Sequence, residues 1–447
     1  MTRPGDASDL GARLADLLAV AWIAAFAAVA VAFALAYPFG HAFDEIEHYS
    51  MIVALHEAPT LFPDLGAQRI LAADRAGWSQ MPNYLAHPPL HHLAMGPLAG
   101  LFPGDVRPVR LAGAALVLVG LLAAWVAGRR RLASPADRLV FTFALFGLPA
   151  TWGVAALINN DAALVCEFGL LFAALAADRR RPVVVGLLVA AIGWTKFNGF
   201  AAALILLALL RLFELRRDGW RPTQTDVAAA LGAAVGAVPT IATLLRWGRP
   251  VWRPERFPDW FDHVRPEIAA TLSPFDYAVW FFDTVARRFP ARIDSFDLAL
   301  PLLGLIGLAA LALRPAAGPD RGRDLARAGV VALLLYAALH LGYGWRSMRE
   351  TGSMVEAQSR YYLAPWVFFA FALPIGIATL PATVARLARA LVVAVVVVAS
   401  VPASLVAALV APAAVDAGHG GDRRPGARLL APAVDPPPPT PPAPPGR

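Results

Sequence analysis

The chain has 447 residues, of which 58% are hydrophobic and only 16% are charged. A soluble domain of this length cannot bury that much apolar surface in one core, so the composition excludes an ordinary soluble enzyme and predicts an integral membrane protein. The net charge of +7 is compatible with nucleic-acid binding, but the arginines gather in short segments between apolar runs, which is typical of cytoplasmic loops. The single cysteine, Cys166, cannot form an intrachain disulfide.

The first apolar run, residues 10–37, is too long for a secretory signal and predicts a membrane anchor that ends on the outer side. A polar segment, 38–89, follows it as the first external loop. Inside this loop the apolar residues at 43–53 recur at helical spacing, which predicts an amphipathic helix on the membrane surface. That helix brings Asp44 within one turn of His48. On helix geometry alone, a solvated face with an acidic N-terminus explains these residues better than a catalytic site does.

Apolar runs of helical length recur along the rest of the chain, and arginine-rich loops alternate with other polar loops between them. The positive-inside rule therefore predicts an all-α bundle of about 11 transmembrane helices with the C-terminus outside. The runs are 10–37, 109–128, 140–158, 162–176, 183–192, 200–213, 227–245, 298–313, 330–343, 361–377 and 391–410. This bundle is predicted to fill residues 1–410, with a second large external loop at 246–296. The proline-rich tail, 411–447, is predicted to be disordered.

Histidines gather where the first loop is predicted to return to the membrane. The stretch AHPPLHH holds His87, His91 and His92 around two prolines, and the apolar run after it, 90–102, is too short to span the membrane. A rigid turn is the plainer interpretation, because prolines restrict the backbone. A metal site or a phosphate-binding site is the alternative.

Three polar residues lie at or inside the run at 162–176. Asn160 and Asp161 directly precede it, and as common capping residues they suit a helix cap as well as a site. Glu167 lies within the run, where an ionisable side chain is costly and is usually paired or functional. The sequence leaves these alternatives open.

The only lysine of the chain, Lys196, stands between two apolar half-runs. It suits snorkelling to the interface and, equally, a point charge for a phosphate. Arg360 and Tyr361 open a later run, either as an interfacial anchor or as a clamp for an anionic lipid head group. The sequence contains no P-loop, Rossmann fingerprint, G-x-S-x-G elbow or zinc-type C-x-x-C pair, so the chemistries of soluble enzymes lose support.

The order of these features resembles the polytopic glycosyltransferases of the GT-C fold, the class of bacterial aminoarabinose transferases and protein O-mannosyltransferases. In that class an acidic motif follows the first transmembrane helix, and Asp44-Glu45 holds this place here. A Lys-Pro-Pro-Leu or His-Pro-Pro-Leu motif often ends the loop, and the sequence from His87 to Leu90 looks like it. The later features are similar as well: Asn160-Asp161, Thr195-Lys196 and Arg360-Tyr361-Tyr362. The Lys-Phe-Asn-Gly hairpin and the lack of a large soluble C-terminal domain are departures from the family.

The resemblance implies transfer of a sugar from a polyprenyl-phosphate-linked donor to an acceptor hydroxyl, with inversion. The site would face outside a cell membrane of the bacterial inner-membrane type. Asp44 would be the base, with Glu45 as second choice. The resemblance and the charge pattern together assign the donor phosphate to Lys196, Arg360, Tyr361 and Arg69, and a supporting role to His48, His87, Asn160 and Asp161. A divalent cation on Asp44, Glu45 and Asp161, or a zinc ion on the histidines, stays an open alternative.

Two other classes of function also remain open. A transporter or flippase for a lipid-linked or anionic substrate would need outward carboxylates and membrane-level cations too, and it would depend on charges inside the spans, such as Glu167. A non-catalytic membrane scaffold would instead depend on the proline-rich tail as a binding segment for partners. The sequence names neither the sugar nor the acceptor.

Overall fold

The computed structural model describes residues 4–40, 44–72, 75, 77–179, 181–219, 221–248, 271–287, 299–314, 320–351 and 358–415. In chain order the elements are α1 (Pro4–Ala36), α2 (Glu45–Glu57), β1 (Arg69–Leu71), β2 (Trp78–Pro82), α3 (Leu90–Leu101), α4 (Arg107–Arg129), α5 (Pro135–Phe146), α6 (Pro149–Ala156), α7 (Asp161–Ala176), α8 (Pro182–Thr195), α9 (Phe197–Asp218), α10 (Gln224–Trp247), α12 (Pro274–Arg287), α13 (Ala299–Ala310), η1 (Leu311–Leu313), α14 (Arg321–Thr351), η2 (Ser359–Tyr362), α15 (Leu363–Ile377) and α16 (Ala382–Val415).

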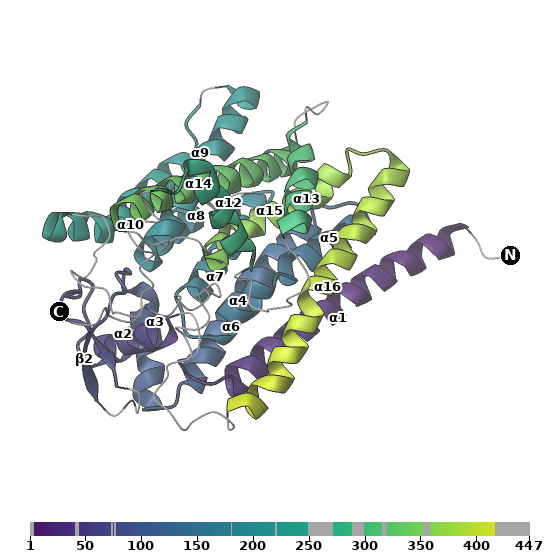
Figure 1. The fold of residues 1–447 in the computed structure, drawn as a ribbon. Coiled ribbons are helices and arrows are strands. Elements are labelled where there is room, and N and C mark those ends of the chain that lie inside the picture. Colours follow the sequence, from purple (N-terminus) through teal and green to yellow (C-terminus); the bar gives the residue numbers. More distant parts are fainter. Residues whose placement is uncertain are drawn as a thin grey trace, which may run out of the picture.

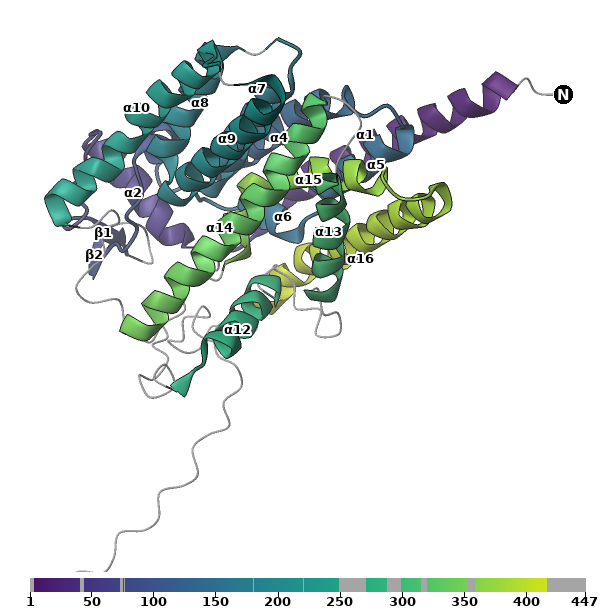
Figure 2. The same ribbon diagram turned by 90° about the horizontal axis from the view of Figure 1, so that it is seen from above.

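Long helices lie beside one another through most of the molecule, while α2, α3 and the strands gather at one end (Figure 1). A view from above shows the same helices as an elongated bundle (Figure 2). In the described residues the only sheet is the antiparallel pair β1 and β2. The prediction of an all-α polytopic membrane protein is therefore confirmed.

Seven helical segments are long and apolar enough to cross a membrane; they lie in α1, α4, α9, α10, α14, α15 with η2, and α16. The bent pair α5 and α6 adds an eighth if its two pieces form one span. The other predicted runs fall on α7, α8 and α13, which have 16, 14 and 12 residues. These helices are shorter than the roughly 20 residues that a bilayer core requires. The count of about eleven spans therefore stays a prediction.

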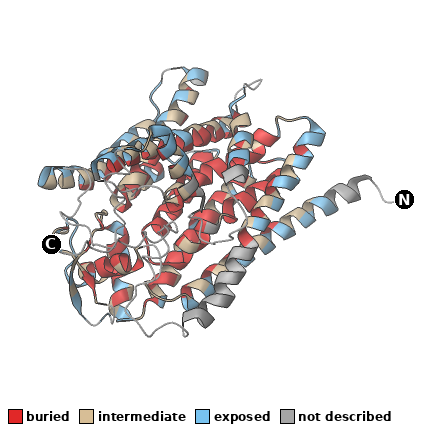
Figure 3. Ribbon diagram, in the orientation of Figure 1, coloured by how far each residue is buried: buried red, intermediate tan, exposed pale blue. Residues whose placement is uncertain are grey.

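The burial pattern separates inner from outer helices (Figure 3). The most apolar stretch of α15 is 83% buried, and Phe368 and Phe371 of this helix pack edge-on against Phe172 of α7. The outer helices α1, α10 and α16 are only 22%, 17% and 22% buried over their most apolar stretches. Apolar side chains can remain exposed on these helices because lipid replaces water around them.

The first external loop folds against the end of the bundle. The predicted helix is present as α2, but it lies inside the protein and not on a membrane surface. Four consecutive residues, Glu47, His48, Tyr49 and Ser50, are buried, which is incompatible with one exposed face. The reason is tertiary: α3 and β1 pack on α2, and the Ser50 hydroxyl accepts the N–H of Leu71 at 2.8 Å.

Two predicted segments lie partly outside the described residues. In the second external loop the structure describes α12, whose Tyr277 and Phe281 pack with Met348 of α14; residues 249–270 and 288–298 are outside it. At the C-terminal end α16 continues to Val415. The remainder of the predicted proline-rich tail, 416–447, is outside the described residues.

Small residues let α4 and α7 approach each other closely. A Cβ atom at Gly169 would overlap the backbone of Gly120 on α4. Replacing Gly169 by Ala should destabilise the protein by about 1–3 kcal/mol, measured as a lower midpoint of thermal unfolding in detergent. Gly342→Ala is the matched control, since no atom lies within 4 Å of the Cβ position there. An equal loss in both variants would contradict the close packing.

Candidate functional site

Asp44, the residue before α2, has an unusual backbone conformation. Its φ of 57° and ψ of 29° are left-handed, a conformation that costs most L-residues energy and that aspartate adopts more readily than most. The side chain does not cap its own helix. It accepts hydrogen bonds from the Tyr84 hydroxyl, at 2.6 Å, and from Arg360 Nη2. The turn therefore directs the carboxylate to a segment 316 residues further along the chain.

Four charged side chains form an alternating series, which we call the charge chain: Asp44, Arg360, Asp161 and Lys196. Arg360 Nε lies 3.7 Å from Asp161 Oδ2, and Lys196 Nζ donates to Asp161 Oδ1 at 2.6 Å. The side chains of Arg360, Asp161 and Lys196 are no more than 4% exposed, whereas that of Asp44 is 25% exposed. Solvent therefore reaches the charge chain at Asp44.

Separate elements supply these residues. Asp44 precedes α2, Asp161 opens α7, Lys196 separates α8 from α9, and Arg360 lies on η2. An isolated buried charge costs several kcal/mol, so the cations are stable here because carboxylates compensate them. The Tyr361 ring lies beside both cations, 4.7 Å from Lys196 Nζ and 5.6 Å from Arg360 Cζ. At these distances a ring face attracts a cation.

The Asp44 carboxylate is ionised at neutral pH. Burial by itself raises its pKa, but the Arg360 guanidinium and the hydrogen bonds from Tyr84 and Arg360 outweigh burial, so the pKa of Asp44 lies below its ordinary value. Burial and the nearby Asp44 charge raise the pKa of Tyr84 well above its ordinary value, so the hydroxyl keeps the proton that it donates. The site thus presents an anionic oxygen that can accept a proton.

Neutral histidines pack near the charge chain. His48 Nδ1 and His92 Nε2 are 3.0 Å apart, so one of them carries the proton that the other accepts. The His87 ring stacks on His48 with 5.5 Å between the ring centroids. Burial is the main cause that lowers the pKa of all three histidines well below its ordinary value, and nearby positive groups, including Lys196, add to it.

The structure does not assemble the suggested metal sites. Within the described residues no group of three or more His, Cys, Asp or Glu side chains is arranged to hold a metal ion. Arg360 lies between Asp44 and Asp161, and Glu45, the third suggested ligand of a divalent cation, is bound elsewhere.

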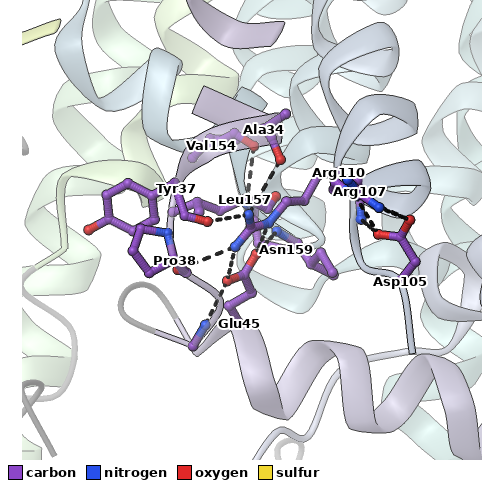
Figure 4. Close-up of polar contacts among 12 residues, drawn as sticks. Ala34, Tyr37, Pro38, Glu45, Asp105, Arg107, Arg110, Val154, Leu157 and Asn159 are labelled. Carbon is purple, nitrogen blue, oxygen red and sulfur yellow. Dashed lines mark hydrogen bonds and ion pairs between the residues drawn. The ribbon is translucent and has the colours of Figure 1, made fainter. Parts of the chain in front are cut away.

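Glu45 is adjacent to Asp44 in sequence but belongs to a different interaction, shown in Figure 4. Its carboxylate oxygens accept hydrogen bonds from Arg110 Nε and Nη2, both at 2.7 Å. The side chains of Glu45 and Arg110 are 0% and 2% exposed. Arg110 also donates to the carbonyl groups of Ala34 and Tyr37 at the end of α1. One ion pair therefore joins α1, α2 and α4.

The same ion pair supports the turn before Asp161. The Ile158 N–H donates to Glu45 Oε1 at 3.1 Å. Asn159, the next residue, accepts the N–H of Ala162 in the first turn of α7 at 3.1 Å, so the helix-capping bond comes from Asn159. Because donors enclose the Glu45 carboxylate and solvent does not reach it, this environment suits a structural role better than that of a base.

Asn160 and Glu167 both hold the hairpin that carries Lys196. The Asn160 side-chain amide donates to the Thr195 carbonyl at 3.1 Å, and the Thr195 hydroxyl donates to Glu167 at 2.6 Å. Both contacts fix the residue directly before Lys196. Glu167 thus has one hydrogen-bond partner, the Thr195 hydroxyl, while its other carboxyl oxygen is buried without a partner among the described residues.

Arg69 differs from the other residues suggested for the donor phosphate. Its guanidinium donates to the carbonyl groups of Gly66 and Gln68 in its own loop, at 3.2 and 3.1 Å. The sequence analysis also missed two residues, Tyr84 and Arg110. An arginine in the first turn of a predicted span was a usable signal for Arg110, whereas a tyrosine in a loop gives none.

Among the solved structures similar to this chain, two cover about four fifths of it. No family model matches the chain, and no curated protein sequence matches it. The two structures are of ArnT from Cupriavidus metallidurans. The apo state has 18% identity and a TM-score of 0.38 and covers 81% of this chain and 78% of that chain. The structure bound to undecaprenyl phosphate has 16% identity and a TM-score of 0.38 and covers 80% and 77%. ArnT is an aminoarabinose transferase, the kind of enzyme that the order of the motifs resembles.

Removing Glu45 leaves the Arg110 charge buried without a partner. Glu45→Gln should therefore lower the free energy of unfolding by about 3–5 kcal/mol, measured by thermal unfolding in detergent. Glu57→Gln, at the exposed end of the same helix, is the matched control and should change it by less than about 0.5 kcal/mol. If the two variants unfold at the same temperature, the pair does not hold these helix ends together.

Acid should destabilise the fold through the histidines. Below about pH 6.5 an unfolded chain binds protons at these residues, whereas the folded protein resists protonation because the pKa of His48 and that of His87 are lowered. The unfolded state then binds more protons, so stability falls as the pH falls below about 6.5. His87→Gln should reduce this dependence of the unfolding midpoint on pH. His56→Gln, an exposed histidine on α2, should leave it unchanged; equal slopes in all three proteins would refute the explanation.

Proposed function

We propose that this protein is a membrane glycosyltransferase of the GT-C type that moves a sugar from a polyprenyl-phosphate-linked donor to an acceptor hydroxyl. The observation that carries the proposal is the charge chain, in which an ionised and partly exposed carboxylate, Asp44, is paired with a buried cation, Arg360. A transfer of this kind needs a base for the acceptor and positive charge for the departing phosphate. The charge chain contains both.

Lys196 and Arg360 are the proposed partners of the donor phosphate. They are the two cations of the charge chain, they share the Asp161 carboxylate, and the Tyr361 ring lies beside both. A guanidinium binds phosphate oxygens in a fork, and an ammonium acts as a point charge. His87 is neutral at pH 7 because its pKa is lowered, so it can offer the phosphate a hydrogen bond but no full charge.

The proposed reaction is a single displacement. Asp44 accepts the proton of the acceptor hydroxyl while the hydroxyl oxygen attacks the anomeric carbon of the sugar. The bond between that carbon and the phosphate oxygen breaks, and its electron pair stays on the phosphate. The phosphate gains negative charge in this step, and Lys196 and Arg360 stabilise it where it develops. One displacement without a covalent intermediate inverts the anomeric configuration.

Arg360 couples donor binding to the strength of the base. While it is paired with Asp44, it lowers the pKa of that carboxylate, which makes Asp44 a weak proton acceptor. A donor phosphate that draws Arg360 away returns the pKa of Asp44 toward its ordinary value, and the carboxylate becomes a better base. The proposed base is thereby prepared only when a donor occupies the site.

The ends of the helices support a site on the outer face. Both cations of the charge chain lie at helix ends, and the charge chain is open to solvent at Asp44. α4 starts at Arg107, one turn before Arg110, and its last residue is Arg129, within a basic segment of three arginines. Basic segments of this kind remain in the cytoplasm. We therefore propose that the charge chain faces outside a cell membrane of the bacterial inner-membrane type.

Asp44→Asn separates the roles of base and phosphate site. Transfer from polyprenyl-phosphate sugars should fall by about 10²–10⁴-fold, because an amide cannot accept the proton. Binding of undecaprenyl phosphate, the lipid named for the second ArnT structure, should be kept or strengthened, since Arg360 loses its competing carboxylate. Asp64→Asn, in the same loop and paired with Arg246 at 2.8 Å, is the matched control and should keep both activities.

Two outcomes contradict the proposal. Near-normal transfer by Asp44→Asn would remove Asp44 as the base. Movement of a lipid-linked substrate across the membrane without consumption of the donor would favour a transporter or flippase. Lys196→Gln gives an independent check, since it should weaken binding of undecaprenyl phosphate while the protein still unfolds cooperatively.

A further inference from the structure

A cavity of about 450 Å³ lies between the end of α1 and the start of α4. The residues that line it include three arginines, one aspartate and two apolar residues: Arg75, Arg107, Arg110, Asp105, Leu35 and Phe39. No residue of the charge chain lines it. Its volume is within the range of sites that bind small molecules or lipid head groups.

Two of the three arginines already have carboxylate partners. Arg110 is enclosed with Glu45 and belongs to the structural ion pair. Arg107 Nε donates to Asp105 Oδ1 and Arg107 Nη2 donates to Asp105 Oδ2, both at 2.8 Å. Arg107 is 59% exposed, and an exposed pair of this kind contributes less than about 1 kcal/mol. Another anion can therefore share Arg107 at small cost.

Arg75 supplies the third positive charge, and Asp105, which Arg107 already binds, interacts with it at longer range. It donates to the Gly104 carbonyl at 2.7 Å, and its guanidinium lies 5.3 Å from the centre of the Phe39 ring. Within the part of the chain that the structure describes, no carboxylate lies within ion-pair distance of Arg75. The carbonyl and the ring hold the guanidinium at the mouth of the cavity without neutralising it.

The cavity also has an apolar lining residue at the end of a candidate membrane span, Leu35. Leu35 lies in the last turn of α1 and is 50% exposed, and α1 carries a candidate span of 27 residues, of whose most apolar stretch only 22% is buried. The cavity therefore opens where a lipid-facing helix leaves the membrane. Its lining residues thus include both an aliphatic side chain, Leu35, and arginines.

We propose that this cavity binds the head group of an anionic glycerophospholipid. The lipid phosphate lies between Arg75 and Arg107, and its acyl chains lie along α1 past Leu35. Free phosphate would match only the cationic side. The three arginines outnumber their two carboxylate partners, Asp105 and Glu45, so a zwitterionic lipid would bring an ammonium or choline group into a net positive site, and the cavity discriminates in favour of a net negative head group.

A lipid bound in the cavity would lie beside the Glu45–Arg110 ion pair. Arg110 lines the cavity and also holds Glu45 and the end of α1. A head group in the cavity adds contacts beside this ion pair, which is already enclosed, and stabilises the end of α1 that Arg110 holds. The site is distinct from that of the proposed donor lipid, whose phosphate partners are Lys196 and Arg360.

The test measures retained lipid on the purified full-length protein by native mass spectrometry. Phosphatidylglycerol and phosphatidylethanolamine with identical acyl chains are offered in equal amounts. The unchanged protein should retain phosphatidylglycerol in preference, and the double variant Arg75→Gln, Arg107→Gln should weaken that retention about 10- to 30-fold. Arg346→Gln, at an exposed arginine that is also paired with a carboxylate, Glu350, is the matched control and should behave as the unchanged protein does.

Equal retention of phosphatidylglycerol by the double variant and by the unchanged protein would overturn the proposal. Displacement of phosphatidylglycerol by inorganic phosphate alone would overturn its lipid part, because the site would then take any phosphate anion. The variant Arg75→Lys, Arg107→Lys keeps the charges and should restore most of the retention, which separates loss of charge from loss of fold. Asp44→Asn should retain the lipid normally, so a failure of the glycosyltransferase proposal and a failure of this one give different results.

Discussion

The Glu45–Arg110 ion pair is the interaction on which the geometry of the site depends. It is enclosed within the protein, and it binds the end of α1, the start of α2 and the turn before α7 through one guanidinium and one carboxylate. Breaking such a pair leaves a buried charge without compensation, which is among the most costly changes a fold can undergo. The left-handed turn at Asp44 is therefore held in place by its neighbour in sequence.

The Glu45–Arg110 pair holds the two segments that carry Asp44 and Asp161. Asp44 and Asp161 carry like charges, and Arg360 between them makes their proximity favourable. The arrangement leaves Asp44 ionised but weakly basic. In the proposed function, Asp44 becomes a stronger base only when the donor phosphate competes for Arg360, which disfavours transfer to water.

Individual residues show which parts of the site the sequence could predict. Asp44, Lys196 and Arg360 come from segments far apart in the chain, and the order of short motifs grouped them before any contact was known. Arg69 was grouped with the residues for the donor phosphate, and the structure gives it carbonyl partners in its own loop. Arg110 was overlooked although an arginine in a predicted span is a usable signal, but its pairing with Glu45, 65 residues away, could not be predicted because no local pattern reports a pair at that separation.

The sequence by itself determined that the chain is a helical membrane protein, since hydrophobic runs of helical length leave the backbone no other way to satisfy its hydrogen bonds in lipid. It also indicated which polar residues stand at the helix ends. Only the tertiary structure decided that α2 is buried and that Asp44 and Glu45 have separate partners. Two adjacent carboxylates are chemically alike in a sequence, and their pairing with Arg360 and Arg110 depends on which distant guanidinium the fold brings to each.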